Sequence, residues 1–165
     1  MLGTLMFVSK IIMEAVPNVH FLGTLIVVYT LVYRVEALIP IYVFVAITGV
    51  YSGFAVWWMP YLYIWTVLWG LVMLVPKRLP LKYLAPVCVA LSCLHGLAFG
   101  ALYAPMQALF YGMDMTATLA WIASGFPFDV MHALGNLVAG VLVVPLSLTL
   151  DKLESRFSGV RRIVK

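Results

Sequence analysis

The chain has 165 residues, of which 65% are hydrophobic and only 10% are charged, and its mean hydropathy is +1.09. Soluble domains carry about 45–50% apolar and about 25% charged residues, so this composition excludes an ordinary soluble domain. The net charge of +4 does not predict nucleic-acid binding, because the basic residues cluster where juxtamembrane anchors belong. We therefore expect an all-α integral membrane protein that forms a single membrane-embedded domain over residues 1–165.

The apolar stretches divide the chain into six candidate membrane spans. A span needs roughly 20 apolar residues, or somewhat fewer where neighbouring helices shield it. The six spans, in chain order, cover about 2–15, 20–33, 37–52, the stretch between Pro60 and Pro76, 82–110 with a possible bend at Pro105, and 127–150 with Pro127 at its start. A short apolar piece at about 116–124 precedes the sixth span.

The basic residues give these spans an orientation. Nine of the ten lie in three places, which are Arg34, then Lys77, Arg78 and Lys82, and finally Lys152, Arg156, Arg161, Arg162 and Lys165. Short loops rich in Lys and Arg stay on the cytoplasmic side of a membrane. Six alternating spans place all three groups on one side, whereas the connections 16–20, 53–60 and 111–127 carry no Lys or Arg. This pattern predicts a six-helix bundle with both termini in the cytoplasm.

The first span carries two ionisable residues, Lys10 and Glu14, which stand four apart on one helix face. Ionisable groups within a span are costly in hydrocarbon and usually face a bundle interior or a wet cavity. The pair either neutralises itself so that the helix can insert, or it lines a pocket and recognises the charge of a polar or zwitterionic ligand.

The richest polar stretch runs from Gly125 to Asn136. Pro127 suits the first turn of a helix, and Asp129 would then complement the positive end of the helix dipole. However, Asp129, His132 and Asn136 stand at i, i+3 and i+7, within about 60° on one face. Capping does not explain three polar groups that descend into the bilayer, so we expect this face to line a site or to pack against another helix.

The fifth span carries a similar stripe, made of Cys88, Ser92, His95, Gly96, Phe99 and Tyr103, with Gln107 near its outer end. A single intramembrane histidine is more often hydrogen-bonded to a neighbouring helix than in contact with a ligand. His95 therefore has a structural reading as well as a functional one.

Aromatic residues crowd the region from 57 to 69. An interfacial belt accounts for Trp57, Trp58 and Tyr61. Trp65 and Trp69 lie deeper, at i and i+4, where they could pack in the core or form a stacking wall for a flat ring. On the predicted topology the polar residues gather in the outer half of the bundle, which indicates an outward-facing pocket with no evident path through.

Three segments together resemble a known family. They are Pro17-Asn18-Val19-His20, the stretch Tyr61–Gly70, and Gly125-Phe126-Pro127-Phe128-Asp129 with His132 and Asn136. The chain resembles the S component of energy-coupling factor transporters, the small substrate-capturing subunit of prokaryotic vitamin importers. It departs from that family in the first span, where small alanines spaced four apart usually dock on the coupling subunit. Here Gly3 is the only comparable small residue near the start of the span, and Phe7 occupies the next position of that spacing, so no docking residues are assigned.

The resemblance implies a multi-pass protein of the prokaryotic plasma membrane with no enzymatic activity, no metal and no cofactor of its own. It implies a vitamin-like ligand, a membrane coupling subunit (T component) and two cytoplasmic ATPases (A subunits) as partners. Asp129, His132 and Asn136 would orient polar groups of the ligand. The full set of candidate substrate-binding residues is Lys10, Glu14, Asn18, His20, Trp58, Trp65, Trp69, His95, Asp129, His132 and Asn136.

Two other classes of protein compete with this reading. A small haem- or metal-binding membrane subunit could use His95 and His132 as ligands. An intramembrane hydrolase would need a nucleophile beside a base, and neither Ser92 with His95 nor Ser124 with Asp129 forms a recognisable motif.

Overall fold

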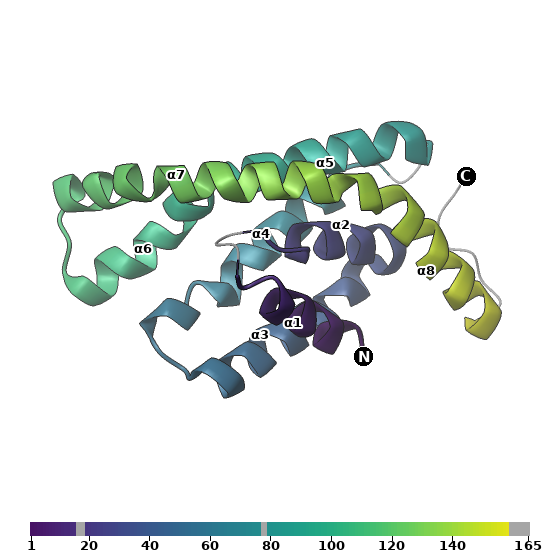
Figure 1. Ribbon diagram of the computed structural model, residues 1–165, viewed down its shortest axis with the longest axis horizontal. Helices are drawn as coiled ribbons and strands as arrows, with labels where there is room; N and C mark the ends of the chain where they lie inside the picture. Colours follow the sequence, from purple (N-terminus) through teal and green to yellow (C-terminus); the bar gives the residue numbers. More distant parts are fainter. Residues whose placement is uncertain (16–18, 77–78, 159–165) are drawn as a thin grey trace.

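The computed structural model describes residues 1–15, 19–76 and 79–158, and within these ranges the protein is helical with no strand. The helices are α1 (Leu2–Ile12), α2 (Leu22–Tyr33), α3 (Leu38–Ser52), α4 (Tyr61–Met73), α5 (Leu81–Leu97), α6 (Phe99–Tyr111), α7 (Met115–Ala139) and α8 (Val143–Ser158). Three short 3-10 turns join them, η1 (Arg34–Ala37), η2 (Val56–Trp58) and η3 (Gly140–Leu142). Figure 1 shows α7 and α5 along one edge of the molecule, with α1 and α3 on the opposite side of α2 and α4.

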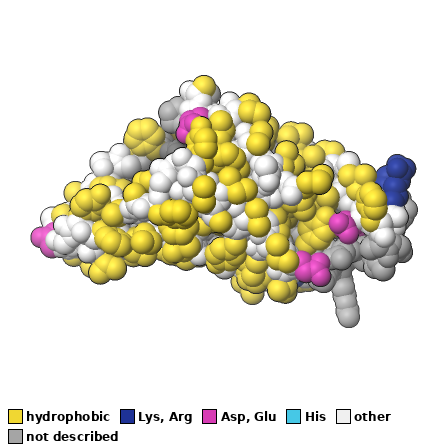
Figure 2. Space-filling model, turned by 90° about the horizontal axis from the view of Figure 1, so that it is seen from below, with side chains coloured by type: hydrophobic (Ala, Val, Ile, Leu, Met, Phe, Trp, Pro, Cys, Tyr) yellow, Lys and Arg dark blue, Asp and Glu magenta, His cyan; other side chains and the backbone are white. Residues whose placement is uncertain are grey.

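Four helical runs in the described part of the chain are long and apolar enough to cross a membrane, and they cover Leu22–Ser52, Val56–Met73, Leu81–Tyr111 and Met115–Phe157. Helix α1 is apolar but shorter, at 11 residues. Large hydrophobic side chains are exposed on each of these four helical runs, and Figure 2 shows apolar side chains over much of one face. The composition-based expectation of an all-helical membrane protein is confirmed at this level, while the division into six oriented spans stays a prediction.

The boundary predicted between the second and third spans coincides with a backbone turn at Arg34. This residue has a φ of 57°, the one positive φ at a non-glycine residue in the described ranges. Such a conformation costs roughly 1–3 kcal/mol and needs support from its surroundings. Helix α4 supplies it, because the Trp69 indole Nε1 donates to the Arg34 carbonyl at 2.9 Å and Arg34 Nη2 donates to the Met73 carbonyl at 2.8 Å.

Helix α2 forms the centre of the bundle. Every residue from Leu22 to Val32 is buried, as expected for a helix that is apolar all round. It packs against α4, α5 and α8, and α1 lies mainly against α3. Buried side chains such as Ile26, Phe44 and Leu68 join these helices into one hydrophobic core.

The predicted fifth span is two helices in the structure, and it breaks at Ala98 rather than at Pro105. Ala98 has φ −90° and ψ 0° and ends α5 while it begins α6. The first backbone amides of a helix have no partner within that helix. The Asp129 carboxylate accepts a hydrogen bond from the Gly100 amide in the first turn of α6, which stabilises the break.

The predicted helix start at Pro127 is wrong. Helix α7 begins much earlier, after Asp114, whose carboxylate accepts a hydrogen bond of 2.7 Å from the Ala117 amide, and it continues through Pro127 to Ala139. Membrane helices tolerate internal proline because neighbouring groups can satisfy the freed backbone carbonyl. The chain then bends through η3 into α8, so the predicted span 127–150 combines the second half of α7 with the first half of α8.

Candidate functional site

Six polar side chains come together in the interior of the protein. They lie on helices α4, α5 and α7 and in the segment just before α2. We call His20, Trp65, Ser92, His95, His132 and Asn136 the polar cluster. What these residues share is a buried nitrogen or oxygen atom that has no hydrogen-bond partner among the described residues. These atoms are His20 Nδ1, Trp65 Nε1, Ser92 Oγ, His95 Nδ1, both ring nitrogens of His132, and Asn136 Oδ1.

His132 is the most isolated member of the polar cluster. It is 2% exposed, and neither ring nitrogen has a hydrogen-bond partner within residues 1–15, 19–76 and 79–158. It meets His20 edge to face at a centroid distance of 4.7 Å, and the Phe99 ring at 4.8 Å. Burial, with a smaller contribution from the nearby charge of Lys10, lowers the pKa of His20 to about 4; the residue lies before the helical run Leu22–Ser52. His20 is therefore neutral near pH 7.

Trp65 connects the polar cluster to the aromatic core. It is 1% exposed, and its ring lies 6.2 Å from His20, 6.1 Å from His95 and 5.7 Å from Phe99, centroid to centroid. Further rings pack on its other sides, including Tyr61 at 5.3 Å. The two readings of Trp65, core packing and a wall beside a polar pocket, are thus both compatible with its position.

His95 contacts a neighbouring helix, as its structural reading predicts for a single histidine within a span. Its Nε2 lies 2.9 Å from the Ile64 carbonyl on α4, and its Nδ1 is left without a partner. One nitrogen thus holds two helices together, while the other remains available to a ligand.

Asn136 and Ser92 extend the cluster one turn further along α7 and α5. Asn136 Nδ2 donates to the Ser92 carbonyl at 2.8 Å, which leaves Asn136 Oδ1 and Ser92 Oγ without partners. Helix α2 approaches both through Gly23, where a Cβ would collide with the Asn136 and Ser92 side chains. The small residue is needed here because α2 passes so close to these polar groups.

Asp129 lies on the same face of α7, and the structure confirms that Asp129, His132 and Asn136 share one buried face with Ala133. The Asp129 side chain is 4% exposed, and its two oxygens share a single donor, the Gly100 amide, at 3.0 and 3.1 Å. The predicted capping role at its own helix is wrong, because the residue caps the start of α6 instead. No Lys or Arg forms an ion pair with it among the described residues.

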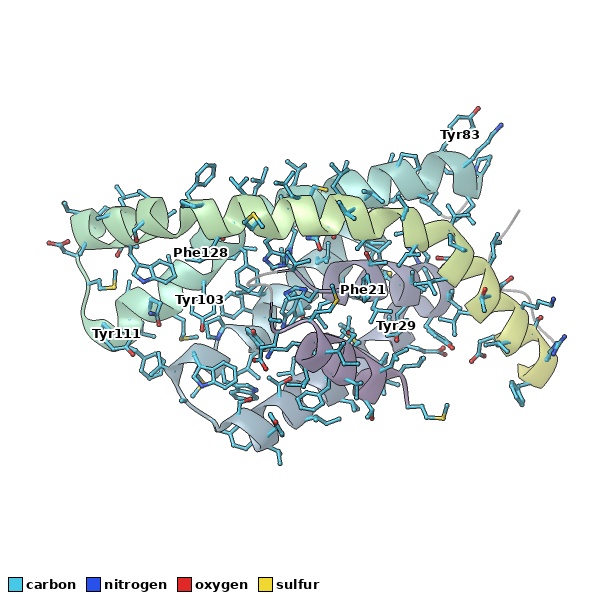
Figure 3. The ribbon with its side chains drawn as sticks, viewed as in Figure 1. Phe21, Tyr29, Tyr83, Tyr103, Tyr111 and Phe128 are labelled. Atoms are coloured by element: carbon cyan, nitrogen blue, oxygen red, sulfur yellow. The ribbon has the colours of Figure 1, made fainter. Side chains whose placement is uncertain are left out.

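A cavity of about 240 Å³ adjoins Asp129 between α6 and α7. We call it the α6–α7 cavity, and its lining residues are Phe99, Gly100, Tyr103, Trp121, Gly125, Phe128 and Asp129. Figure 3 shows Tyr103 and Phe128 in the region between these two helices. The sequence pattern did not connect Trp121 with the site, because only the return of α7 along α6 brings it to Tyr103.

Lys10 and Glu14 form an ion pair with an Nζ–Oε1 distance of 3.4 Å, and their side chains are 18% and 64% exposed. This geometry is that of the self-neutralising pair. The polar cluster contains neither residue, although the charge of Lys10 acts on His20.

The remaining candidates lie elsewhere. The Trp58 indole donates to the Val45 carbonyl at 2.8 Å and packs on Phe54, so it secures η2 against α3. Trp69 supports the turn at Arg34, away from the polar cluster. Asn18 lies outside the described residues.

The structure gives no metal-binding arrangement within the described ranges, where no group of three or more His, Cys, Asp or Glu side chains is placed to hold a metal ion. Comparisons with protein-family models, with curated proteins and with solved structures found no match to this chain.

Proposed function

We propose that this protein is a substrate-binding subunit of the energy-coupling factor type, which captures a polar, vitamin-like molecule from outside a prokaryotic cell. In this proposal the chain crosses the plasma membrane six times with both termini in the cytoplasm. A coupling subunit (T component) and two ATPases (A subunits) use ATP to drive release of the ligand inside. The resemblance of three sequence segments and the distribution of Lys and Arg support this assignment.

The observation that carries the proposal is the set of seven buried polar atoms in the polar cluster that have no hydrogen-bond partner in the part of the chain that the structure describes. An unsatisfied buried polar group costs about 1–3 kcal/mol. Seven of them would offset a large share of the roughly 5–15 kcal/mol by which a folded protein is stable. Such groups persist where they serve binding, because a ligand that pairs with them gains the interactions that the protein lacks.

The cluster also fits binding better than chemistry. His95 and Trp65 are fixed by packing and by the contact with Ile64, so they present rigid donors and acceptors. Ser92 Oγ makes no hydrogen bond with His95 or with any other base, so the pair lacks the contact that activates a serine nucleophile. The side chains that converge here can recognise a polar molecule without altering it.

The test begins with purification in mild detergent, followed by mass spectrometry of the small molecules that co-purify. We expect a polar compound in the wild-type protein and its loss in the double variant His132→Phe, Asn136→Leu, which replaces the polar atoms with apolar groups in side chains of similar shape. Ser147→Ala provides a matched control, since Ser147 is also buried with an unpartnered hydroxyl but lies on α8, outside the cluster. Unchanged ligand content in the double variant would refute the proposed site, and a Soret band in the wild-type spectrum would favour the haem alternative.

A further inference from the structure

The α6–α7 cavity has the composition of an aromatic box. Four of its seven lining residues are aromatic, namely Phe99, Tyr103, Trp121 and Phe128. The rings of Tyr103 and Trp121 lie nearly parallel, 23° apart, with centroids separated by 6.0 Å. Phe99 adjoins Tyr103 at 6.0 Å. A Cβ at Gly125 would meet no atom within 4 Å, so the cavity has open space on the α7 side.

The walls of this box are held in place. The Tyr103 hydroxyl donates to the Trp57 carbonyl, which fixes the ring against η2. Phe99 is packed on its other side by His132 and Trp65. Rigid aromatic faces carry a negative quadrupole and attract cations that lie over them.

A buried carboxylate completes the cavity. Ionised Asp129 has about four sites that can accept hydrogen bonds, and the Gly100 amide is the one donor that the structure gives it. No Lys or Arg forms an ion pair with Asp129 among the described residues, so no basic side chain there neutralises its charge. An unpaired buried carboxylate is costly, and a positively charged ligand group would offset that cost.

The cavity and the polar cluster share one wall. The Phe99 ring borders the cavity and contacts His132, and Asp129 stands one helical turn from His132 on the same face of α7. A ligand that occupies both regions would place a charged group beside Asp129 and uncharged hydrogen-bonding groups beside His132 and Asn136. The sign of the charge follows from the lining, which contains one carboxylate and no Lys or Arg.

We propose that the α6–α7 cavity binds a flat or compact organic cation, with Asp129 as its counter-ion and the rings of Tyr103 and Trp121 as its aromatic walls. This inference rests on the proposed function, because it names the chemical class of the ligand that the site captures. It predicts that the protein binds cationic ligands and does not bind anionic ones.

The first experiment uses three flat probes of nearly the same shape, which are benzamidine, benzamide and benzoate. Their binding to the purified wild-type protein is measured by isothermal titration calorimetry in detergent at pH 7. We expect the benzamidine cation to bind at least about tenfold more tightly than neutral benzamide, in line with the strength of charge-assisted hydrogen bonds, and we expect no binding of benzoate. Equal affinity for the cation and the neutral probe, or no binding of either, overturns the proposal.

The second experiment tests the residues. Asp129→Asn removes the charge but keeps an oxygen that can accept from the Gly100 amide, so α6 retains its cap. We expect benzamidine to bind roughly 10- to 100-fold more weakly to this variant, and Asp114→Asn, which removes an exposed carboxylate, to leave its affinity unchanged. Trp121→Leu should weaken binding by roughly 2- to 30-fold, whereas Trp121→Phe, which keeps an aromatic face, should retain most of the affinity. Wild-type affinity in Asp129→Asn overturns the assignment, because it means that the residue acts as a neutral acid.

The double variant His132→Phe, Asn136→Leu separates this proposal from the proposed function. If the variant loses the co-purifying ligand and the wild-type protein ignores benzamidine, the cation proposal fails while the binding function stands. If benzamidine binding requires Asp129 but the double variant loses no co-purifying molecule, the cation site in the α6–α7 cavity is supported and the proposed function fails.

Discussion

A close contact between the backbones of α5 and α7, beside the polar cluster, predicts that one added methyl group will weaken the protein. Gly96 on α5 faces Ala133 on α7, and a Cβ at Gly96 would lie 2.9 Å from the Ala133 nitrogen and 3.1 Å from its Cα. The same Cβ would lie 3.1 Å from Asn136 Nδ2, which donates to the Ser92 carbonyl. The two nearest atoms belong to the backbone of a long helix, so Gly96→Ala can be accommodated only if α5 and α7 move apart.

The magnitude follows from two opposing effects. Overpacking of a well-packed contact costs about 1–3 kcal/mol. Replacement of glycine by alanine inside a helix contributes about 0.5–1 kcal/mol in the other direction. Gly96→Ala should therefore destabilise the protein by about 1 kcal/mol, and by as much as about 2 kcal/mol. Small residues at helix contacts allow close approach in membrane proteins, and this is such a contact.

Gly70 provides the matched control. It lies inside α4, and a Cβ there would meet no atom within 4 Å. Gly70→Ala should therefore gain the helix-propensity term alone and stabilise the protein by about 0.5–1 kcal/mol. The measurement is reversible unfolding in detergent, where 1 kcal/mol corresponds to about 2–4 °C in Tm for a chain of this size. Two shifts in the same direction would refute the close approach of α5 and α7 at Gly96.

Two further predictions concern α7 and the segment before α2. Pro127→Ala restores an amide that can donate to the Ala123 carbonyl inside α7, so we expect a gain of roughly 1 kcal/mol or more, and a loss of stability would indicate that the helix begins at Pro127 instead. The second prediction concerns His20, whose pKa is lowered to about 4 in the folded protein, below its ordinary value of 6.5. The folded state then binds fewer protons than the unfolded state, so stability is intact above pH 6.5 and falls by at most about 3 kcal/mol as the pH drops from 6.5 through 4. His20→Asn should flatten this part of the pH profile in urea or thermal unfolding, and an unaltered profile would show that His20 does not titrate there.

The sequence predicted the membrane class and the polar face of α7 because both depend on features that repeat along the chain. An apolar fraction of 65% leaves few alternatives to membrane helices. The i, i+3, i+7 spacing of Asp129, His132 and Asn136 places them on one face of any helix that contains them. The turn at Arg34 was also predicted, since charged residues interrupt an apolar run there.

The helix boundaries near the site were harder to predict, because long-range contacts set them. Pro127 favours a helix start on local grounds, yet Asp114 provides the cap and α7 continues through the proline. Ala98 carries no local signal for a break. The break there is stabilised by Asp129, 31 residues further along the chain, through the Gly100 amide. No local pattern contains that contact.

The different roles of Trp65 and Trp69 also depend on long-range contacts that the local sequence does not show. The two residues stand one turn apart on α4, and the sequence leaves them the same two alternatives, core packing or a stacking wall for a flat ring. In the structure Trp65 belongs to the polar cluster and contacts His20, whereas the Trp69 indole donates a hydrogen bond to the Arg34 carbonyl. One turn of helix moves a side chain about 5.4 Å along the axis, which is enough to transfer it from the cluster to the turn below.

The electrostatics of the interior follow from how its few charges are paired. Lys10 could have served as counter-ion to Asp129, but it lies 3.4 Å from Glu14, and the pair is already neutral. Asp129 stays without a basic partner in the described part of the chain and is almost fully buried. It must nevertheless remain a hydrogen-bond acceptor, because the start of α6 depends on it. A protonated carboxyl group or an asparagine side chain could also accept the hydrogen bond from the Gly100 amide. The negative charge is therefore needed only if Asp129 binds a ligand, and not if it only caps α6. A difference between aspartate and asparagine in cation binding, at unchanged stability of α6, would therefore assign the charge to the ligand.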